Sequence, residues 1–90
     1  MPEPGIDNIA KRELIRALKK VRKKDFERLL SDLMSSSEVK DLSRRLLAAK
    51  FLSEGKTYLE INEIMGMSEG TINKVYFKTR GSKVLPNLFA

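Results

Sequence analysis

The stretch Thr57–Arg80, TYLEINEIMGMSEGTINKVYFKTR, decides the fold because its apolar positions and a glycine predict two short helices joined by a tight turn. Ile61, Ile64 and Met65 form an apolar stripe on the first of these helices, since residues three and four apart share a helix face. Gly66 follows immediately, where a residue without a side chain lets the backbone leave the helix. The first half of the stretch therefore predicts a helix that packs on one side and ends at a glycine.

The second half of the stretch predicts a helix with one apolar side and one polar side. Met67 should point back inward, and Ser68 is a residue type that caps helices. Ile72 and Val75 lie three residues apart and form the inner face. The outward positions are mostly polar: Glu69, Gly70, Asn73 and Lys74. This is the arrangement of a helix-turn-helix, in which the second helix enters the major groove of DNA.

The outward face supplies candidate contacts to bases and to phosphates. Asn73 can pair with adenine, Glu69 can accept from cytosine, and Lys74 can donate to guanine. An acidic residue in a first turn also suits the helix dipole, so Glu69 has a structural explanation as well. We expect base contacts from Ser68, Glu69, Gly70, Asn73 and Lys74. We expect phosphate contacts from Lys56, Thr57, Tyr58, Thr71, Lys78 and Arg80.

Two positions in the stretch admit a second interpretation. Asn62 stands where a small alanine usually lets the two helices close together. Gly70 costs roughly 1 kcal/mol of helix stability relative to alanine, unless it permits a close approach of the backbone to DNA. Two short helices around a glycine also occur as plain packing units in small bundles.

The composition excludes most catalytic chemistry. The 90 residues include no cysteine and no histidine, which removes thiolate catalysis, disulfides, the commonest general base and the commonest transition-metal ligands. We therefore expect no catalytic residues, no metal and no cofactor. The sequence has no apolar run long enough to span a membrane and no signal peptide, so we expect no membrane partner and a cytoplasmic location.

The net charge of +6 is unevenly distributed. Residues 1–24 carry eight basic and three acidic side chains, residues 25–54 carry five and six, and residues 55–90 carry five and three. Both ends are therefore basic, as expected if both approach a polyanion. The basic cluster at 19–24 can add phosphate contacts, and a solvated helix face explains it equally well.

The remaining sequence predicts an all-α chain of five to six helices. Residues 1–6 form a flexible leader, and a single helical domain follows over 7–90. Within it we expect helices at about 7–21 (capped by Asp7 or Asn8), 25–34 and 35–54, the helix-turn-helix at 57–80, and an apolar tail at 81–90. The apolar residues of the third helix are Val39, Leu42, Leu46, Leu47, Ala49 and Phe51, with Leu52 near its end. The tail is apolar enough to pack on the body or on a second subunit.

The run LMSSSEVKDLSRRLLAAKFLSEGKTYLEINEIMGMSEGTINKV, with the later GSKVL, resembles the tryptophan-repressor superfamily, especially its YerC/YecD-type branch. The resemblance covers roughly residues 7–85 and includes a Ser-x-x-Glu helix cap at Ser35–Glu38. It implies an intertwined homodimer, in which residues 7–54 form the dimerisation helices. It also implies a cytoplasmic regulator that binds a near-palindromic double-stranded DNA site.

The resemblance also indicates how this chain treats the family's corepressor, tryptophan. Ser35 and Arg45 fall on a pocket threonine and a pocket arginine of the repressor. Lys74 replaces the arginine that stacks over the indole, Val75 replaces a glycine, and Lys78 replaces a serine that meets the amino group. An ammonium facing an ammonium is repulsive, so we expect no tryptophan control. The alternative function is a protein-interaction module that keeps the fold without reading DNA.

Overall fold

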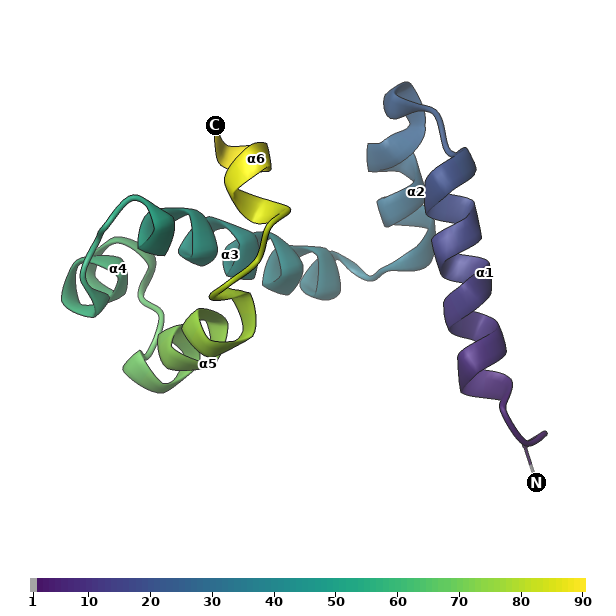
Figure 1. The fold of residues 1–90 in the computed structure, drawn as a ribbon, viewed down its shortest axis with the longest axis horizontal. Coiled ribbons are helices and arrows are strands. Elements are labelled where there is room, and N and C mark those ends of the chain that lie inside the picture. Colours follow the sequence, from purple (N-terminus) through teal and green to yellow (C-terminus); the bar gives the residue numbers. More distant parts are fainter. Residues whose placement is uncertain (1) are drawn as a thin grey trace. The chain divides into compact units, whose positions relative to one another are not determined.

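A computed structural model describes residues 2–90, and every regular element in that range is a helix (Figure 1). The six α-helices are α1 (Ile6–Lys20), α2 (Phe26–Leu33), α3 (Ser36–Ser53), α4 (Tyr58–Met65), α5 (Glu69–Thr79) and α6 (Leu85–Phe89). A 3-10 turn, η1 (Lys23–Asp25), precedes α2. The predicted all-α fold of five to six helices is confirmed. The chain divides into two compact units, an N-terminal unit (1–36) and a C-terminal unit (37–90); the single domain over 7–90 stays a prediction.

The N-terminal unit is a helical hairpin in which α2 runs back in the direction opposite to α1 (Figure 1). The cap predicted for α1 is wrong. Gly5, with φ of 77°, occupies the cap position without a side-chain hydrogen bond, and Asp7 and Asn8 lie inside the helix. Asp7 still suits the first turn because a carboxylate there interacts favourably with the helix dipole. No residue of α1 or α2 is buried within the chain.

The C-terminal unit holds the buried core, which lies where α3, α4 and α5 meet. Six side chains are buried: Ala48, Ala49, Ile61, Met67, Ile72 and Val75. The two adjacent alanines of α3 are small enough to let α4 and α5 approach its backbone closely. The other large apolar side chains of this unit pack around the edge of that cluster or remain exposed.

Several residues of the predicted apolar stripes are exposed within the chain. Leu42, Leu46 and Leu47 of α3 are all more than 40% exposed, because the core forms beside the alanines in the C-terminal half of that helix. Ile64 is 57% exposed, so the inner face of α4 consists of Ile61 and the half-buried Met65. The sequence pattern identifies these side chains as apolar but does not show that this chain leaves them uncovered.

The tail packs on the body of the C-terminal unit, which confirms one of the two predicted locations. Leu85 and Phe89 of α6 pack against the core cluster. The helical conformation of this segment was not predicted. It begins next to Pro86, a residue favoured in the first turn of a helix, and Ser82 Oγ accepts a hydrogen bond from the Leu85 N–H at 3.1 Å.

Candidate nucleic-acid interface

The turn between α4 and α5 has the predicted geometry. Gly66, with φ of 67°, ends α4 in the left-handed conformation that glycine adopts without strain. Ser68 Oγ accepts a hydrogen bond from the Thr71 N–H at 3.2 Å and so caps α5. Asn62 Nδ2 donates to the Met67 carbonyl at 2.8 Å. Asn62 therefore does not disturb the close packing of the two helices; it ties α4 to the turn.

Arg44 of α3 helps to hold the helix-turn-helix in place, a role that the sequence pattern did not indicate. Its guanidinium donates to the carbonyl of Met65, at the last residue of α4. The last carbonyls of a helix lack partners within the helix, and α4 has no basic residue of its own in its last turn. The sequence signal for such a contact is this lack of a basic residue in the last turn of α4, because a basic residue from another helix can then bond to the free carbonyls. Arg44 thus fixes the end of α4 to α3.

The predicted base-contact residues all lie on the exposed side of α5 or in its cap. Ile72 and Val75 are buried, whereas Ser68, Glu69, Gly70, Asn73 and Lys74 are exposed. Around Gly70, no atom lies within 4 Å of the position that a Cβ would occupy. Packing within the chain therefore does not require a glycine at this position.

Asn73 is held in place by α4. Tyr58 donates its hydroxyl proton to Asn73 Oδ1 at 3.0 Å, a hydrogen bond between the beginning of α4 and the middle of α5. The Tyr58 ring also packs edge-on against Tyr76, with ring centroids 6.4 Å apart. Tyr58 was predicted as a phosphate contact. Its hydrogen bond orients the amide of Asn73, the side chain best suited to read adenine.

The other predicted phosphate contacts occupy different local environments. Thr57 caps α4 in a capping box: its Oγ1 accepts from the Glu60 N–H at 3.1 Å, and its N–H donates to Glu60 Oε1 at 3.0 Å. Lys56 Nζ lies 5.5 Å from the centre of the Phe51 ring, and the Arg80 guanidinium lies 4.8 Å from that of Phe77. The remaining two, Thr71 and Lys78, line a cleft between α3 and α5.

The capping box predicts a pH dependence. The backbone N–H and the hydroxyl of Thr57 both stabilise the carboxylate of Glu60, so the pKa of Glu60 lies below its ordinary value of 4.5. A pKa lowered by folding stabilises the fold above the unfolded-state pKa, and this contribution disappears as the pH falls through the folded-state pKa. Between about pH 6 and pH 3, we expect Glu60→Gln to lose slightly less of its free energy of unfolding than the wild type. Parallel urea titrations measure this difference, and identical pH profiles would contradict it.

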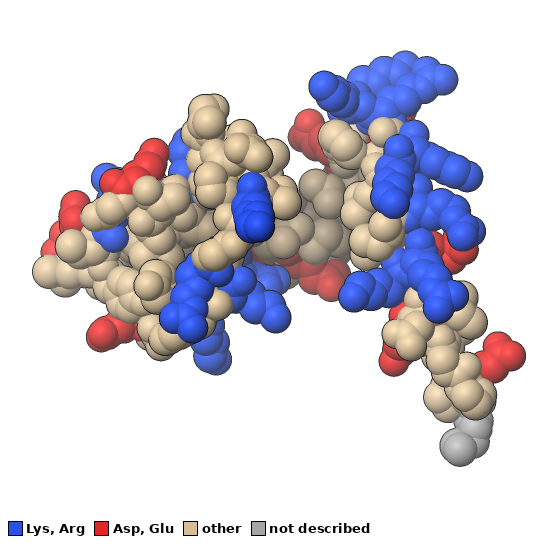
Figure 2. All heavy atoms as spheres, in the orientation of Figure 1, with Lys and Arg blue, Asp and Glu red and all other residues tan. Residues whose placement is uncertain are grey.

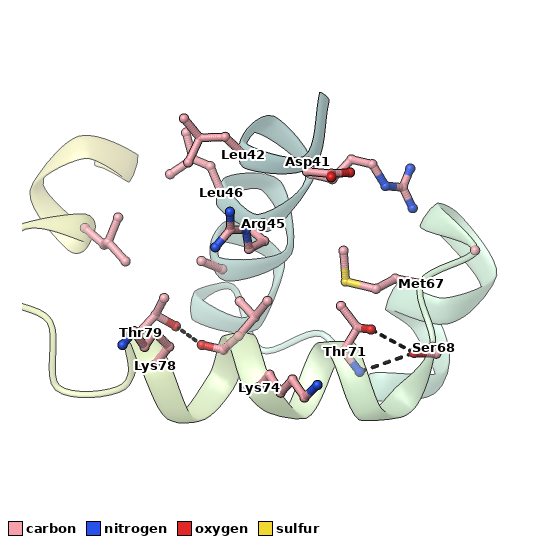
Figure 3. A pocket seen from close by; sticks show the side chains of 15 residues that line it. Asp41, Leu42, Arg45, Leu46, Met67, Ser68, Thr71, Lys74, Lys78 and Thr79 are labelled. Atoms are coloured by element: carbon pink, nitrogen blue, oxygen red, sulfur yellow. Dashed lines mark hydrogen bonds between the residues drawn. The ribbon is translucent and has the colours of Figure 1, made fainter. Parts of the chain in front are cut away.

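The cleft, of about 800 Å³, has a strongly basic wall (Figure 3). Arg45 reaches into it from α3, and Lys74 and Lys78 line it from α5. Asp41 is its one acidic lining residue, and no ion pair joins Asp41 to Arg45 among the described residues. Four of the five positions that the resemblance assigned to the tryptophan pocket line this cleft: Arg45, Lys74, Val75 and Lys78. Ser35 is not among its lining residues.

Two other kinds of site are absent from residues 2–90. No group of three potential metal ligands comes together in this range. None of the helices described there is long and apolar enough to cross a membrane.

The fold and this surface define a helix-turn-helix protein. The chain belongs to the Trp repressor protein family, whose family model matches residues 11–88. Membership of this family indicates a helix-turn-helix DNA-binding regulator.

A relative from Bacillus subtilis (strain 168), uncharacterized protein YerC, is 40% identical over 55 residues. The match covers 58% of this chain and 53% of YerC, so the matching region spans about half the length of that relative. No solved structure matches the chain. The resemblance to the YerC-type branch of the superfamily is confirmed.

Proposed function

We propose that this protein is a homodimeric transcriptional regulator that binds a specific, near-palindromic sequence of double-stranded DNA. The observation that carries the proposal is the geometry of α5: Ile72 and Val75 anchor its back in the core, and its polar front is exposed. A rigidly anchored helix with a polar front is what major-groove reading requires. Such a regulator would act in the cytoplasm.

On this proposal, Ser68, Glu69, Gly70, Asn73 and Lys74 contact bases. Asn73 is the strongest assignment, because its amide is already oriented by Tyr58. The phosphate contacts would come from Lys56, Thr57, Tyr58, Thr71, Lys78 and Arg80. Lys56 and Arg80 stack on aromatic rings in the free protein, so their charged groups are held close to the surface of the helix-turn-helix.

The apolar surface that the chain leaves uncovered supports the homodimer. Each unit exposes several large aliphatic side chains; those of α1 are Ile6, Ile9, Leu14, Ile15 and Leu18, and those of α3 are Leu42, Leu46 and Leu47. Only six residues are buried within residues 2–90, which is a small core for a chain of this length. Large exposed apolar patches mark association surfaces, and a second copy of the chain would cover these.

The decisive test is selection of bound duplexes from a random library by the purified full chain. We expect a near-palindromic consensus whose half-sites lie about one helical turn apart. Affinity for the selected duplex should fall by orders of magnitude between low and moderate salt. Absence of any enriched sequence, or an interaction insensitive to salt, would overturn the proposal.

One observation supports the second candidate function, a protein-interaction module. The N-terminal half of the α5 surface is mixed in charge, with Glu69 and Lys74, and the neighbouring helix exposes Leu59 and Ile64. Such a surface also suits a protein partner. Failure of the library selection, combined with a stable folded dimer, would favour this alternative.

Tryptophan should have no effect on the protein. Val75 is buried in the cleft wall at a position where the repressor has glycine, and Lys78 would face the amino group of a bound amino acid. We expect no heat of binding in calorimetry at millimolar tryptophan, and the same DNA affinity with and without it. A tenfold gain in DNA affinity on adding tryptophan would contradict this expectation.

Replacing Gly70 by alanine should affect stability and DNA binding in opposite directions. The space around Gly70 is open and its φ is not positive, so a Cβ fits and the helix gains up to about 1 kcal/mol. On DNA the added methyl group would hold the backbone away from the groove, and we expect affinity to fall by roughly tenfold or more. Thermal unfolding and titration of the selected duplex measure the two effects. A more stable variant with unchanged affinity would show that no close approach occurs at Gly70.

A further inference from the structure

Helix α1 carries a set of basic side chains that the helix-turn-helix does not use. Figure 2 shows Lys and Arg crowded over the N-terminal unit, with few acidic atoms among them on this face. We define the α1 basic face by five exposed residues: Lys11, Arg12, Arg16, Lys19 and Lys20. Such a face is either only solvated or binds a negatively charged partner.

The positions of these residues bring their charges together. A step of four residues advances about one helical turn, so residues 11, 15 and 19 form one row and residues 12, 16 and 20 form the row beside it. Lys11, Arg12, Arg16 and Lys19 line a shallow groove of about 450 Å³, with Ile15 as the only apolar lining residue. The groove is therefore a concentrated positive surface on a single helix.

These charges are largely uncompensated. Arg16 bonds to Glu13 at 2.9 Å, and that is the only ion pair that any residue of the α1 basic face makes within residues 2–90. Solvated helix faces usually intersperse the two signs of charge, which reduces self-repulsion. A face that accumulates one sign instead favours a polyanionic partner.

We propose that the α1 basic face binds the phosphate backbone of duplex DNA, independently of sequence and in addition to the contacts of α5. This inference rests on the proposed function. From Lys11 to Lys19 the helix rises about 12 Å, a length over which one DNA strand advances by roughly three to four nucleotides along the helix axis. The groove presents no apolar side chain beyond Ile15, whereas insertion into a lipid surface needs a broad apolar face, so a lipid surface fits it poorly.

The test compares two triple variants of the full chain. Lys11→Gln, Arg16→Gln and Lys19→Gln together neutralise the α1 basic face and keep good helix-forming residues. The control is Lys40→Gln, Lys50→Gln and Lys83→Gln, which removes the same charge. These three lysines are exposed and line neither the cleft between α3 and α5 nor the groove on α1. Circular dichroism and light scattering verify that both variants keep the fold and the oligomeric state of the wild type.

The measured quantity is the slope of log binding constant against log salt concentration. For the α1 variant we expect this slope to become shallower by about 0.9 for each phosphate that the protein no longer neutralises, hence by roughly 2 to 3 per chain. Affinity for the selected duplex and for an unrelated duplex should fall by the same factor. The control variant should keep a slope close to that of the wild type.

The outcomes separate this inference from the proposed function. Equal slopes in the two variants would overturn the role of the α1 basic face, even if α5 still selects a sequence. A changed slope without any sequence preference would support the face and overturn the proposed reading by α5. Equal slopes, together with binding of phosphatidylserine vesicles that the α1 variant loses, would assign the face to a membrane surface and overturn the inference.

Discussion

Leu18→Glu should dissociate the protein and unfold most of it at micromolar concentration. Leu18 lies on the apolar side of α1 and is 42% exposed in the single chain, so the proposed dimer would bury what remains uncovered. Losing a buried leucine costs about 1.5–3 kcal/mol, and a buried carboxylate adds to that cost. Since each dimer contains two copies, the loss is about 3 kcal/mol or more, which is at least roughly a hundredfold in dimer Kd. Light scattering and thermal unfolding at several protein concentrations measure it.

The matched control is Leu59→Glu, which places the same residue at an exposed leucine of α4. Leu59 is 67% exposed, and an acidic residue in a first turn suits the helix dipole. We expect this variant to remain dimeric, with a stability within about 0.5 kcal/mol of the wild type. The unfolding midpoint of the wild type should rise with protein concentration. A monomeric wild type with a concentration-independent midpoint would contradict the homodimer.

The local structure of the helix-turn-helix could be predicted because the signals for it lie close together in the sequence. Gly66, Ser68 and the pair Ile72 and Val75 each depend on neighbours within one or two turns, and the structure places all of them as predicted. Turn and cap chemistry is local, so a single sequence contains it.

The contacts between helices could not be predicted in the same way. Arg44 reaches a carbonyl 21 residues away, and Tyr58 reaches an amide 15 residues away. Periodicity identifies which face of a helix is apolar, but it does not show whether the same chain or a second copy covers that face. This is why Leu42, Leu46 and Leu47 belong to the predicted apolar set of α3 and are nevertheless exposed within the chain, whereas the small Ala48, which gives a weak signal, is buried.

Substitution of Asn73 by alanine should reduce affinity for the selected DNA and relax its base preference at one position of each half-site. An asparagine that reads adenine contributes about 1–3 kcal/mol of discrimination, or roughly tenfold to a hundredfold per half-site. Thermal stability should change little, because Asn73 is exposed and its side-chain hydrogen bond to Tyr58 lies at the surface. Repeating the library selection with the variant measures the preference directly. An unchanged consensus would rule out Asn73 as a base contact.

The role of Tyr58 can be separated from that of Asn73 by a double-mutant cycle. Tyr58→Phe keeps the ring that packs on Tyr76 and removes only the hydroxyl that donates to Asn73 Oδ1. If Tyr58 acts by positioning Asn73, the single variant should relax the same base position by a smaller amount, and it should add almost nothing to Asn73→Ala. If its hydroxyl instead contacts a phosphate, affinity for every sequence should fall equally and the two losses should add. Because the hydrogen bond already exists without DNA, we expect the first result: α4 holds the amide in its reading orientation before the groove is reached, so the ordering cost on binding is small.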